Sequence, residues 1–571
     1  MPTKPLNTFD FLLLAFVLIL SAFCYTPCLN AEFVNWDDPL YIYNNPTILN
    51  FQINDFSSWK NVLLDFNPTV TYAPLTSLSF ALEKSIYGIE APHLWHLDNV
   101  LLHLGVIVFI FLISKRLGLS VWATALVALL FGIHPMRVES VAWLTERKDV
   151  LYAIFYLWAI LSYLKMKQSE PNIIRYLFIL FVFLLSLMSK IQAVTLPIAL
   201  ILIDFVIEEK IGWKQIWDKI PFFLLALAFG LIGMLYTKGD LTQGADATFD
   251  LHNAIMWTSM TLWAYLYKLF VPIPLLAIYP FPSSFRWHEY IAIFIPIAGV
   301  IVLGYSLLNK HKMMFFGLAF FAINVLFTLP VIPLGQGYQA DRFTYVAYFG
   351  LFLLISIGFK KWVDNNKNMQ NLLLGILIPC IVFLIHTSYK QSGIWKNSET
   401  LWTHQIAHTP YQESVFLNRS AYYESIGEKK LAENDINSAL ISSPKLSKTF
   451  HLKGKHLLSY GLDSVRKAIT YFNKAINIDP KKYEGYYVNR SVALGRDGRT
   501  KEALSDLDKA LDINPMHTHA LLNRAAIYYQ LNEPEKSLDD IENYLLLVPD
   551  DQRVKDIRDQ IRGGGKEGMR E

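Results

Sequence analysis

The sequence has few cysteines and few charged residues, and both shortages limit what the protein can be. Only three cysteines occur in 571 residues, Cys24, Cys28 and Cys380, and their spacing matches no metal or redox pattern. Charged residues make up 17% of the chain and hydrophobic residues 53%, which is too apolar for an ordinary soluble protein. The net charge of +3 is nearly balanced and argues against a nucleic-acid partner.

Several motifs of soluble enzymes are also absent from the sequence. It contains no glycine-rich phosphate loop, no zinc motif and no serine-nucleophile elbow. A nucleotide-dependent active site on the cytoplasmic side is therefore not supported.

The apolar residues concentrate before about Tyr389, in runs long enough to cross a hydrocarbon core of roughly 30 Å as helices. The first run, Phe11 to Phe23, follows Lys4 like a signal peptide, but Cys24-Tyr25-Thr26-Pro27 is a poor cleavage site, so we interpret it as an uncleaved span. Eleven spans are predicted, at about 10–28, 97–114, 121–135, 150–165, 173–188, 191–207, 221–237, 290–308, 314–332, 344–359 and 371–387.

Lysine and arginine predict the orientation of these spans, because short cytoplasmic loops are enriched in both. One alternating set of loops holds Lys4, Lys115, Arg116, Lys165, Lys167, Lys210, Lys214, Lys219, Lys310, Lys312, Lys360, Lys361 and Lys367. An odd number of spans then places the N-terminus inside and the C-terminal domain outside. Residues 255–272 are amphipathic, and a crossing there would reverse the later part of this topology. We favour an interfacial or re-entrant helix on the outer face.

The C-terminal part carries an internal repeat. Prolines 410, 444, 480, 515 and 549 recur at spacings of 34, 36, 35 and 34, the period of a tetratricopeptide repeat. Twelve, eight and five residues before each of the last four prolines lie a small residue, an apolar residue, and then alanine or tyrosine. An Asn-Arg-small triplet also recurs, at Asn418, Asn489 and Asn523.

The chain is therefore predicted to be all-α, with a polytopic membrane domain at 1–389 followed by a tetratricopeptide-repeat α-solenoid. Residues 390–410 are predicted to be a half-repeat connector, 411–561 about four repeats, and 562–571 a disordered tail. The outer-face loops of the membrane domain are 29–96, 134–149, 238–289 and 333–343, together with a tight turn at Ser189-Lys190.

Asp37 and Asp38 follow Trp36 in the first outer loop. Because Asp-Asp-Pro is good turn chemistry, these residues could simply form a turn or a helix cap. Alternatively, the pair supplies a general base, an acceptor-orienting carboxylate or a metal site at the membrane surface.

Basic residues in outer loops do not favour membrane insertion, so their presence there must have another explanation. They form either a solvated loop with internal ion pairs or a pocket for a lipid-linked phosphate, which arginine binds with two hydrogen bonds and lysine as a point charge. Arg342 with Asp341 could also be a simple snorkelling pair. The candidates are His134, Arg137, Glu139, Arg147, Lys148, Asp149, Lys190, Asp341 and Arg342.

Six stretches occur in a fixed order along the chain: Phe33-Val-Asn-Trp-Asp-Asp, Tyr72-Ala-Pro-Leu-Thr-Ser-Leu-Ser-Phe, His134-Pro with Glu139, Arg147 and Asp149, Ser189-Lys190 to Leu196-Pro197, Ala340-Asp-Arg-Phe-Thr-Tyr, and Trp395-Lys-Asn-Ser-Glu-Thr-Leu-Trp. Together and in this order they resemble one family, the transmembrane and tetratricopeptide-repeat glycosyltransferases, which include animal protein O-mannosyltransferases and bacterial relatives. Only about four repeats are present here, fewer than in the animal members, which indicates a bacterial member.

The resemblance implies a GT-C fold and transfer of a sugar from a polyprenyl-phosphate donor to a hydroxyl acceptor on the non-cytosolic face. Asp37 or Asp38 would be the base, and Arg137, Arg147, Lys190 and Arg342 would bind the donor phosphate. Trp36, His134, Glu139, Asp149 and Asp341 would support the site.

The expected setting follows from the same resemblance. A divalent cation such as Mg²⁺ or Mn²⁺ is a possible cofactor, and the repeats would hold an acceptor protein. The enzyme would lie in a bacterial inner membrane with its repeats in the periplasm, or in the endoplasmic reticulum membrane with luminal repeats. The other classes consistent with the sequence are a membrane-anchored repeat scaffold for envelope-protein assembly and a transporter of a lipid-linked substrate. A transporter would, however, predict an internal repeat in the membrane half, which the sequence does not contain.

Overall fold

The computed structural model describes residues 6–64, 71–170, 172–208, 212–237, 250–282, 284–331, 337–365, 370–444, 446–460, 464–481 and 483–567. Helices make up the regular structure of these ranges, and the β-pairing found in them is one isolated bridge between Tyr279 and Gln339. The predicted all-α class is confirmed. The chain divides into two compact units, Met1–Gln405 and Ile406–Glu571.

The first unit is built on long apolar helices, and a helix overlaps each of the eleven predicted spans. Within the described residues, five helices are long and apolar enough to cross a membrane, or six if a pair bent by 59° at residue 134 counts as one span. The count of eleven therefore stays a prediction. The long helices are α1 (Thr8–Cys24), α5 (Pro92–Arg116), α6 (Val121–Ile133), α8 (Arg147–Lys167), α9 (Ile173–Ser189), α10 (Leu196–Glu208), α12 (Ile220–Thr237), α13 (Leu251–Lys268), α14 (Phe294–Leu308), α15 (Lys312–Leu326), α16 (Tyr348–Asn365) and α17 (Gln370–Ile394).

Local sequence explains where several of these helices begin. Asn7 and Asp10 form a reciprocal capping box at the start of α1, which satisfies two backbone N–H groups that the helix leaves open. Proline occupies the first position of α5 and of α4 (Pro74–Tyr87), where its missing N–H has no helical partner in any case. The amphipathic segment 255–272 lies mostly in α13, a single continuous helix.

Small residues allow two pairs of these helices to pack closely. A Cβ added to Gly350 of α16 would lie 2.3 Å from the carbonyl oxygen of Gly317 in α15. A Cβ on Gly132 of α6 would lie 2.1 Å from the Ser21 hydroxyl of α1. Such close backbone approach is typical of packing between membrane helices, where dispersion contacts and hydrogen bonds replace the hydrophobic driving force.

The segment between α1 and α5, predicted to be the first outer loop, folds into shorter helices around its own apolar cluster. These are α2 (Pro46–Leu49), α3 (Phe56–Leu63) and α4, and the cluster includes Ile42, Phe51, Phe80 and Trp95. The segment is tied to the residues that follow α17 by three hydrogen bonds: from Glu32 N to the Lys396 carbonyl (2.8 Å), from Asn35 N to Ser398 Oγ (2.8 Å) and from Trp402 Nε1 to Asn35 Oδ1 (2.7 Å). These bonds hold the chain that leads into Asp37 and Asp38.

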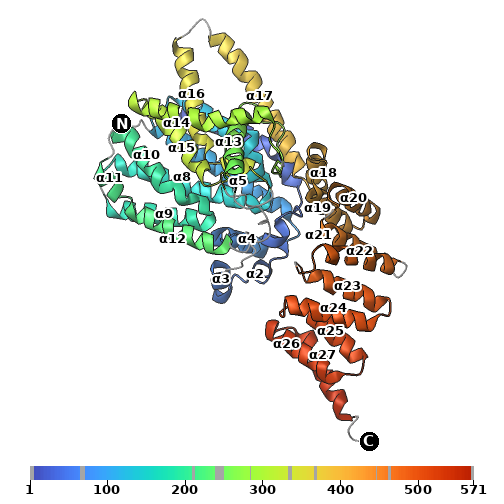
Figure 1. Cartoon of the computed structure of the whole chain (residues 1–571). Helices are drawn as coiled ribbons and strands as arrows, with labels where there is room; N and C mark the ends of the chain where they lie inside the picture. Colours follow the sequence, from blue (N-terminus) through green and yellow to red (C-terminus); the bar gives the residue numbers. More distant parts are fainter. Residues whose placement is uncertain are drawn as a thin grey trace. The chain divides into compact units, whose positions relative to one another are not determined.

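The second unit consists of helix pairs, coloured brown to red in Figure 1, as the repeat pattern predicts. Ala432, Ala468, Ala503 and Ser537, the small residues of the pattern, are all buried. The pairs are α19 (Glu413–Ser425) with α20 (Lys429–Ser442), α21 (Ser447–Leu458) with α22 (Val465–Ile478), α23 (Gly485–Arg496) with α24 (Thr500–Ile513), and α25 (Thr518–Gln530) with α26 (Pro534–Leu547). A last helix, α27 (Gln552–Glu567), covers residues 562–567 of the predicted tail, and residues 568–571 lie outside the described residues.

The recurring Asn-Arg-small triplet has a structural explanation. Its arginine forms a paired hydrogen bond to an aspartate sixteen residues later, at Arg419–Asp435, Arg490–Asp506 and Arg524–Asp540. Each pair links the two helices of one repeat. A guanidinium and a carboxylate joined by two hydrogen bonds fix the relative position of two helices well.

Candidate functional site

Asp38 is held by protein donors on both of its carboxylate oxygens. Oδ2 accepts a hydrogen bond from the N–H of Val34 at 2.8 Å. Oδ1 accepts from Trp143 Nε1 at 3.0 Å, from the N–H of Thr145 at 3.2 Å and from its hydroxyl at 2.5 Å. The residue is 1% exposed, and burial raises the pKa of the carboxyl group to about 6, although the Thr145 hydrogen bond acts in the opposite direction. Asp38 thus joins the first outer segment to the segment around Trp143.

Asp37 is placed differently. Its backbone carbonyl accepts hydrogen bonds from the N–H groups of Leu40 and Tyr41, both at 3.0 Å, and so begins the single helical turn η2 (Pro39–Tyr43). The residue is half-buried, and its carboxylate is near enough to Lys148 for an electrostatic interaction. The Nζ of Lys148 lies 4.3 Å from the ring centre of Tyr41.

A row of aromatic rings connects this aspartate pair to Arg342. Trp36 stacks on Trp143 with ring centres 4.3 Å apart and an angle of 2° between the planes, and Trp143 lies 5.5 Å from Trp395. The guanidinium of Arg342 lies 5.4 Å from the centre of the Trp143 ring. A cation over an indole face is attracted by its π electrons. The Trp36–Asp37 segment and Arg342 therefore both lie against Trp143.

Three cations surround the buried carboxylate of Glu146. One oxygen, Oε1, is 3.3 Å from Lys148 Nζ and 3.5 Å from Arg342 Nε, and the other, Oε2, is 2.9 Å from Lys190 Nζ. Lys190 also pairs with Asp149 at 2.8 Å, and Arg342 pairs with Glu139 through its side chain and its backbone N–H. The structure thus brings together residues that the sequence distributes over 203 positions. We call Glu139, Glu146, Lys148, Asp149, Lys190 and Arg342 the charge cluster.

The side chains of the charge cluster differ in their exposure to solvent. The side chains of Arg342 and Lys190 are 19% and 12% exposed, whereas that of Asp149 is fully buried. Despite its burial, the pKa of Arg342 is raised above the usual value, because the carboxylates of Glu139, Glu146 and Asp149 stabilise the charged form. Arg342 and Lys190 are therefore fixed and partly exposed cations.

Arg137 and Arg147 lie outside this cluster and bind other parts of the protein. Arg137, fully buried, donates to the carbonyls of Thr344 and Tyr345 and to the Thr344 hydroxyl. Arg147, also fully buried, donates to Asn99 Oδ1 at 2.6 Å and to the Trp95 carbonyl at 2.9 Å, and it pairs with Glu83.

The two remaining predicted residues make their own contacts. His134 is buried, with Nε2 3.2 Å from the Leu269 carbonyl. Asp341 does not pair with Arg342. It accepts from Lys268 Nζ and from the Tyr279 hydroxyl, both at 2.8 Å, so this part of the site also depends on residues of the predicted loop 238–289.

The sequence reasoning missed Glu146, Trp143, Lys268 and Tyr279 as site residues. Glu146 stands directly before Arg147, in a segment already singled out for its charges, and that was the available signal. Nothing local marks Trp143 or Tyr279, whose roles depend on contacts with distant segments. In the described part of the chain, no group of three or more histidine, cysteine, aspartate or glutamate side chains is arranged to hold a metal ion.

Comparison with known proteins identifies the repeats and relates the whole chain to one group of proteins. The tetratricopeptide repeat family model matches residues 496–561. The protein O-mannosyl-transferase F38B6.6 of Caenorhabditis elegans is 26% identical over 76% of this chain and 63% of its own length. TMTC4 of Homo sapiens is 24% identical over 69% of this chain and 61% of its own, and TMTC3 of Mus musculus is 23% identical over 94% and 63%. The latter two are also named protein O-mannosyl-transferases, and the chain spans less than two thirds of each relative.

The fold and the comparisons define an all-helical protein in which a unit with several membrane-length helices precedes a tetratricopeptide-repeat unit. Over most of its length, the chain is similar to these proteins named protein O-mannosyl-transferases.

Proposed function

We propose that this protein is a membrane glycosyltransferase of the GT-C type that transfers a hexose from a polyprenyl-phosphate donor to serine or threonine hydroxyls of proteins. The names of its relatives support a sugar donor and a protein acceptor. The observation that carries the proposal is a half-buried aspartate, Asp37, beside Lys148 of a fixed charge cluster in which Arg342 and Lys190 are partly exposed.

Within this proposal, Asp37 is the base and Asp38 the residue that positions it. Both oxygens of Asp38 already accept hydrogen bonds from Val34, Trp143 and Thr145, and the side chain is buried. A base must come within hydrogen-bond reach of the proton that it removes. Asp37, next to it and half-buried, meets that requirement better.

The charge cluster would serve the donor phosphate. The acceptor hydroxyl oxygen bonds to the anomeric carbon, its proton goes to Asp37, and the bond from that carbon to the phosphate oxygen breaks. The electron pair leaves with the lipid phosphate, whose negative charge grows as the bond breaks. Arg342 and Lys190, with Lys148 behind them, would stabilise that charge, and cations fixed beforehand are effective because they need no reorganisation.

The fully engaged arginines would act indirectly. Arg137 holds the backbone just after Arg342, and Arg147 connects α8 to Asn99 of α5 and Glu83 of α4. We propose that they position the site and do not bind the phosphate themselves. Glu139 and Asp149 would fix Arg342 and Lys190, Trp36 would fix the Asp37 segment against Trp143, and His134 and Asp341 would support the neighbouring backbone.

A divalent cation fits this donor set poorly. The Asp38 oxygens already accept four hydrogen bonds, and the nearby carboxylates of Glu139, Glu146 and Asp149 pair with cations. Mg²⁺ and Mn²⁺ need several oxygen ligands at once. We therefore assign no step of the reaction to a metal.

The setting of the enzyme is part of the same proposal. We place the charge cluster on the non-cytosolic face, because the lysine-rich loops predict the cytoplasmic side for the opposite helix ends. The repeats would then bind the acceptor protein on that face, in the periplasm of a bacterium or the lumen of the endoplasmic reticulum. Repeat arrays bind extended peptides well because they present a long surface.

Sugar transfer by the purified full chain tests the assignment of the base. We expect Asp37→Asn to lower the transfer rate by about 100-fold or more, since general bases contribute that much, with an unchanged melting temperature. Glu90→Gln, which removes an exposed carboxylate from the same outer segment, is the matched control and should keep full activity. Full transfer by Asp37→Asn, with a loss confined to Asp38→Asn at unchanged stability, would show that Asp38 is the base.

A further inference from the structure

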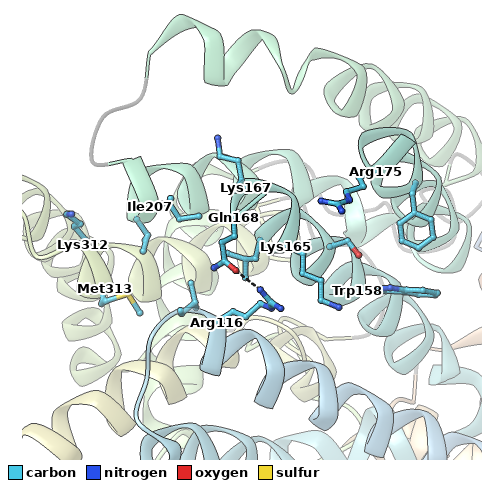
Figure 2. A pocket seen from close by; sticks show the side chains of 14 residues that line it. Arg116, Trp158, Lys165, Lys167, Gln168, Arg175, Ile207, Lys312 and Met313 are labelled. Carbon is cyan, nitrogen blue, oxygen red and sulfur yellow. Dashed lines mark hydrogen bonds between the residues drawn. The ribbon is translucent and has the colours of Figure 1, made fainter. Parts of the chain in front are cut away.

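A second charged region lies at the other end of helix α8. The first turn of α8 contributes Lys148 and Asp149 to the charge cluster, and its 21 residues extend for about 30 Å, the thickness of a hydrocarbon core. Lys165 and Lys167 in its last turn line a cavity of about 1080 Å³ (Figure 2). The cavity and the candidate site therefore lie at opposite ends of a helix of membrane-spanning length.

The lining of this cavity is strongly basic. Five of its fourteen lining residues are lysine or arginine and none is aspartate or glutamate. They come from four helix ends: Arg116 from α5, Lys165 and Lys167 from α8, Arg175 from α9 and Lys312 from α15. Figure 2 shows Arg116, Lys165 and Arg175 on one side of the α8 end, with Trp158 beside them.

Lysine and arginine are enriched at cytoplasmic helix ends because they set the topology, so their presence alone does not indicate a binding site. Whether each cation forms an ion pair with a carboxylate is more informative. Three lysines at the same ends are paired: Lys115 with Asp10, Lys219 with Asp204, and Lys360 with Asp364. Lys167 is also paired, with Asp204 and Glu208.

Three other cations of the cavity, Arg116, Lys165 and Arg175, behave differently. Arg116 donates to Gln168 Oε1 and Arg175 to Ser169 Oγ, which are neutral acceptors. Within the described residues, no carboxylate pairs with Arg116, Lys165 or Arg175. These three cations can bind an external anion without first breaking an ion pair.

Apolar side chains stand directly beside these cations. Trp158 and Phe178 pack edge to face with ring centres 5.5 Å apart, and they are 36% and 40% exposed. Both line the cavity, and both belong to helices of the apolar unit. Cations next to exposed aromatic rings match a molecule with a charged head and a hydrocarbon tail.

We propose that this cavity binds the phosphate headgroup of an anionic membrane lipid. The guanidinium groups of Arg116 and Arg175 hold the phosphate oxygens, Lys165 adds a third positive charge, and an acyl chain lies along Trp158 and Phe178. Arginine suits phosphate because its planar fork donates two parallel hydrogen bonds. The site is separate from the sugar-transfer site, and the inference does not rest on the proposed function.

Lipid retention by the purified full chain tests the proposal. The protein is taken from vesicles of phosphatidylcholine with cardiolipin or phosphatidylglycerol, and the lipid that stays bound is measured by native mass spectrometry. We expect the triple variant R116Q/K165Q/R175Q to retain at most about a tenth of the anionic lipid that the wild type retains. The matched control, K310Q/K360Q/K361Q, removes the same charge from the connection after α14 and from the C-terminal part of α16 without touching the cavity, and should retain the wild-type amount.

Three outcomes would overturn the proposal. Equal losses in both triple variants would show general surface attraction. Equal retention of phosphatidylcholine, whose headgroup has no net charge, would show that the cavity does not select anions. Displacement of bound lipid by free glycerol phosphate or inorganic phosphate at the concentration of the lipid itself would make the ligand a soluble anion.

A measurement on the wild-type chain covers the case in which the triple variant does not fold. Anionic lipid should raise the melting temperature more than phosphatidylcholine does, and the single variant Arg175→Gln should reduce that rise. Arg175 is exposed and its side chain bonds to a neutral hydroxyl, so this variant should fold. An equal rise with both lipids would contradict the proposal.

Discussion

The charges at the two ends of helix α8 are arranged in opposite ways. At the first turn, three cations of the charge cluster face three carboxylates, and all six side chains are buried or mostly buried. At the last turn, five cations line a cavity without a carboxylate in its lining. A buried charge loses its hydration free energy and needs an oppositely charged or hydrogen-bonding partner to offset that loss. An exposed charge is stabilised by water and needs no such partner.

The difference also separates two modes of anion binding. At the charge cluster, the carboxylates hold each cation in one place, which suits stabilisation of a charge that appears during a reaction. At the opposite end, Arg116, Lys165 and Arg175 keep their charge available for a resident anion. The comparison predicts that removal of one carboxylate changes the stability of the protein much more at the charge cluster than beside the basic cavity.

The largest effect is expected from Glu146→Gln. Glu146 contacts Lys148, Lys190 and Arg342, and loss of its charge leaves three cations facing two carboxylates in a buried region. Breaking a buried pair of this kind destabilises proteins by about 3–5 kcal/mol. We expect a correspondingly large fall in the melting temperature of the full chain in detergent. A melting temperature equal to that of the wild type would mean that the cluster is hydrated and that its burial has been overestimated.

The sequence allowed prediction of those features that follow from a local period. Prolines spaced by 34–36 residues predicted the repeat helices, and the buried Ala432 and Ala503 occupy the positions that the pattern assigned. The apolar runs likewise predicted the long helices, because a helix that crosses a membrane must satisfy its own backbone. Each of these features is contained in one segment of the chain.

The site could be predicted only in part, because its geometry depends on distant contacts. Arg137 and Arg342 look alike in the sequence, each being a basic residue in an outer loop. The structure surrounds Arg137 with the carbonyls of Thr344 and Tyr345 and leaves Arg342 partly exposed between two glutamates. No spacing in the sequence encodes that difference, which arises from packing between segments about 200 residues apart.

The pH dependence of stability tests whether Asp38 belongs to the buried, paired type of charge. Burial raises its pKa in the folded state from 3.8 to about 6, so folding takes up a proton between these two values. The contribution of Asp38 to stability is therefore greatest at low pH and falls as the pH rises through about 6, by on the order of 2–3 kcal/mol.

Melting curves of the wild type and Asp38→Asn between pH 4 and pH 7 measure this effect, because the change lies between the two pKa values. Asparagine does not titrate, so the advantage of the wild type in melting temperature should shrink as the pH rises. An advantage that grows with pH would show instead that the hydrogen bonds from Val34, Trp143 and Thr145 favour the charged carboxylate more strongly than burial opposes it.

The smallest effect is expected from Glu208→Gln, the counterpart of Glu146→Gln beside the basic cavity. Glu208 pairs with Lys167, but the two side chains are 30% and 20% exposed, and Lys167 keeps Asp204 at 3.1 Å. Ion pairs with this much access to water contribute about 0–1 kcal/mol, so the melting temperature should change little. Anionic lipid should bind at least as well, because the variant adds net positive charge next to the cavity. A loss of stability comparable to that of Glu146→Gln would mean that both ends of α8 depend on pairing, and the contrast between them would fail.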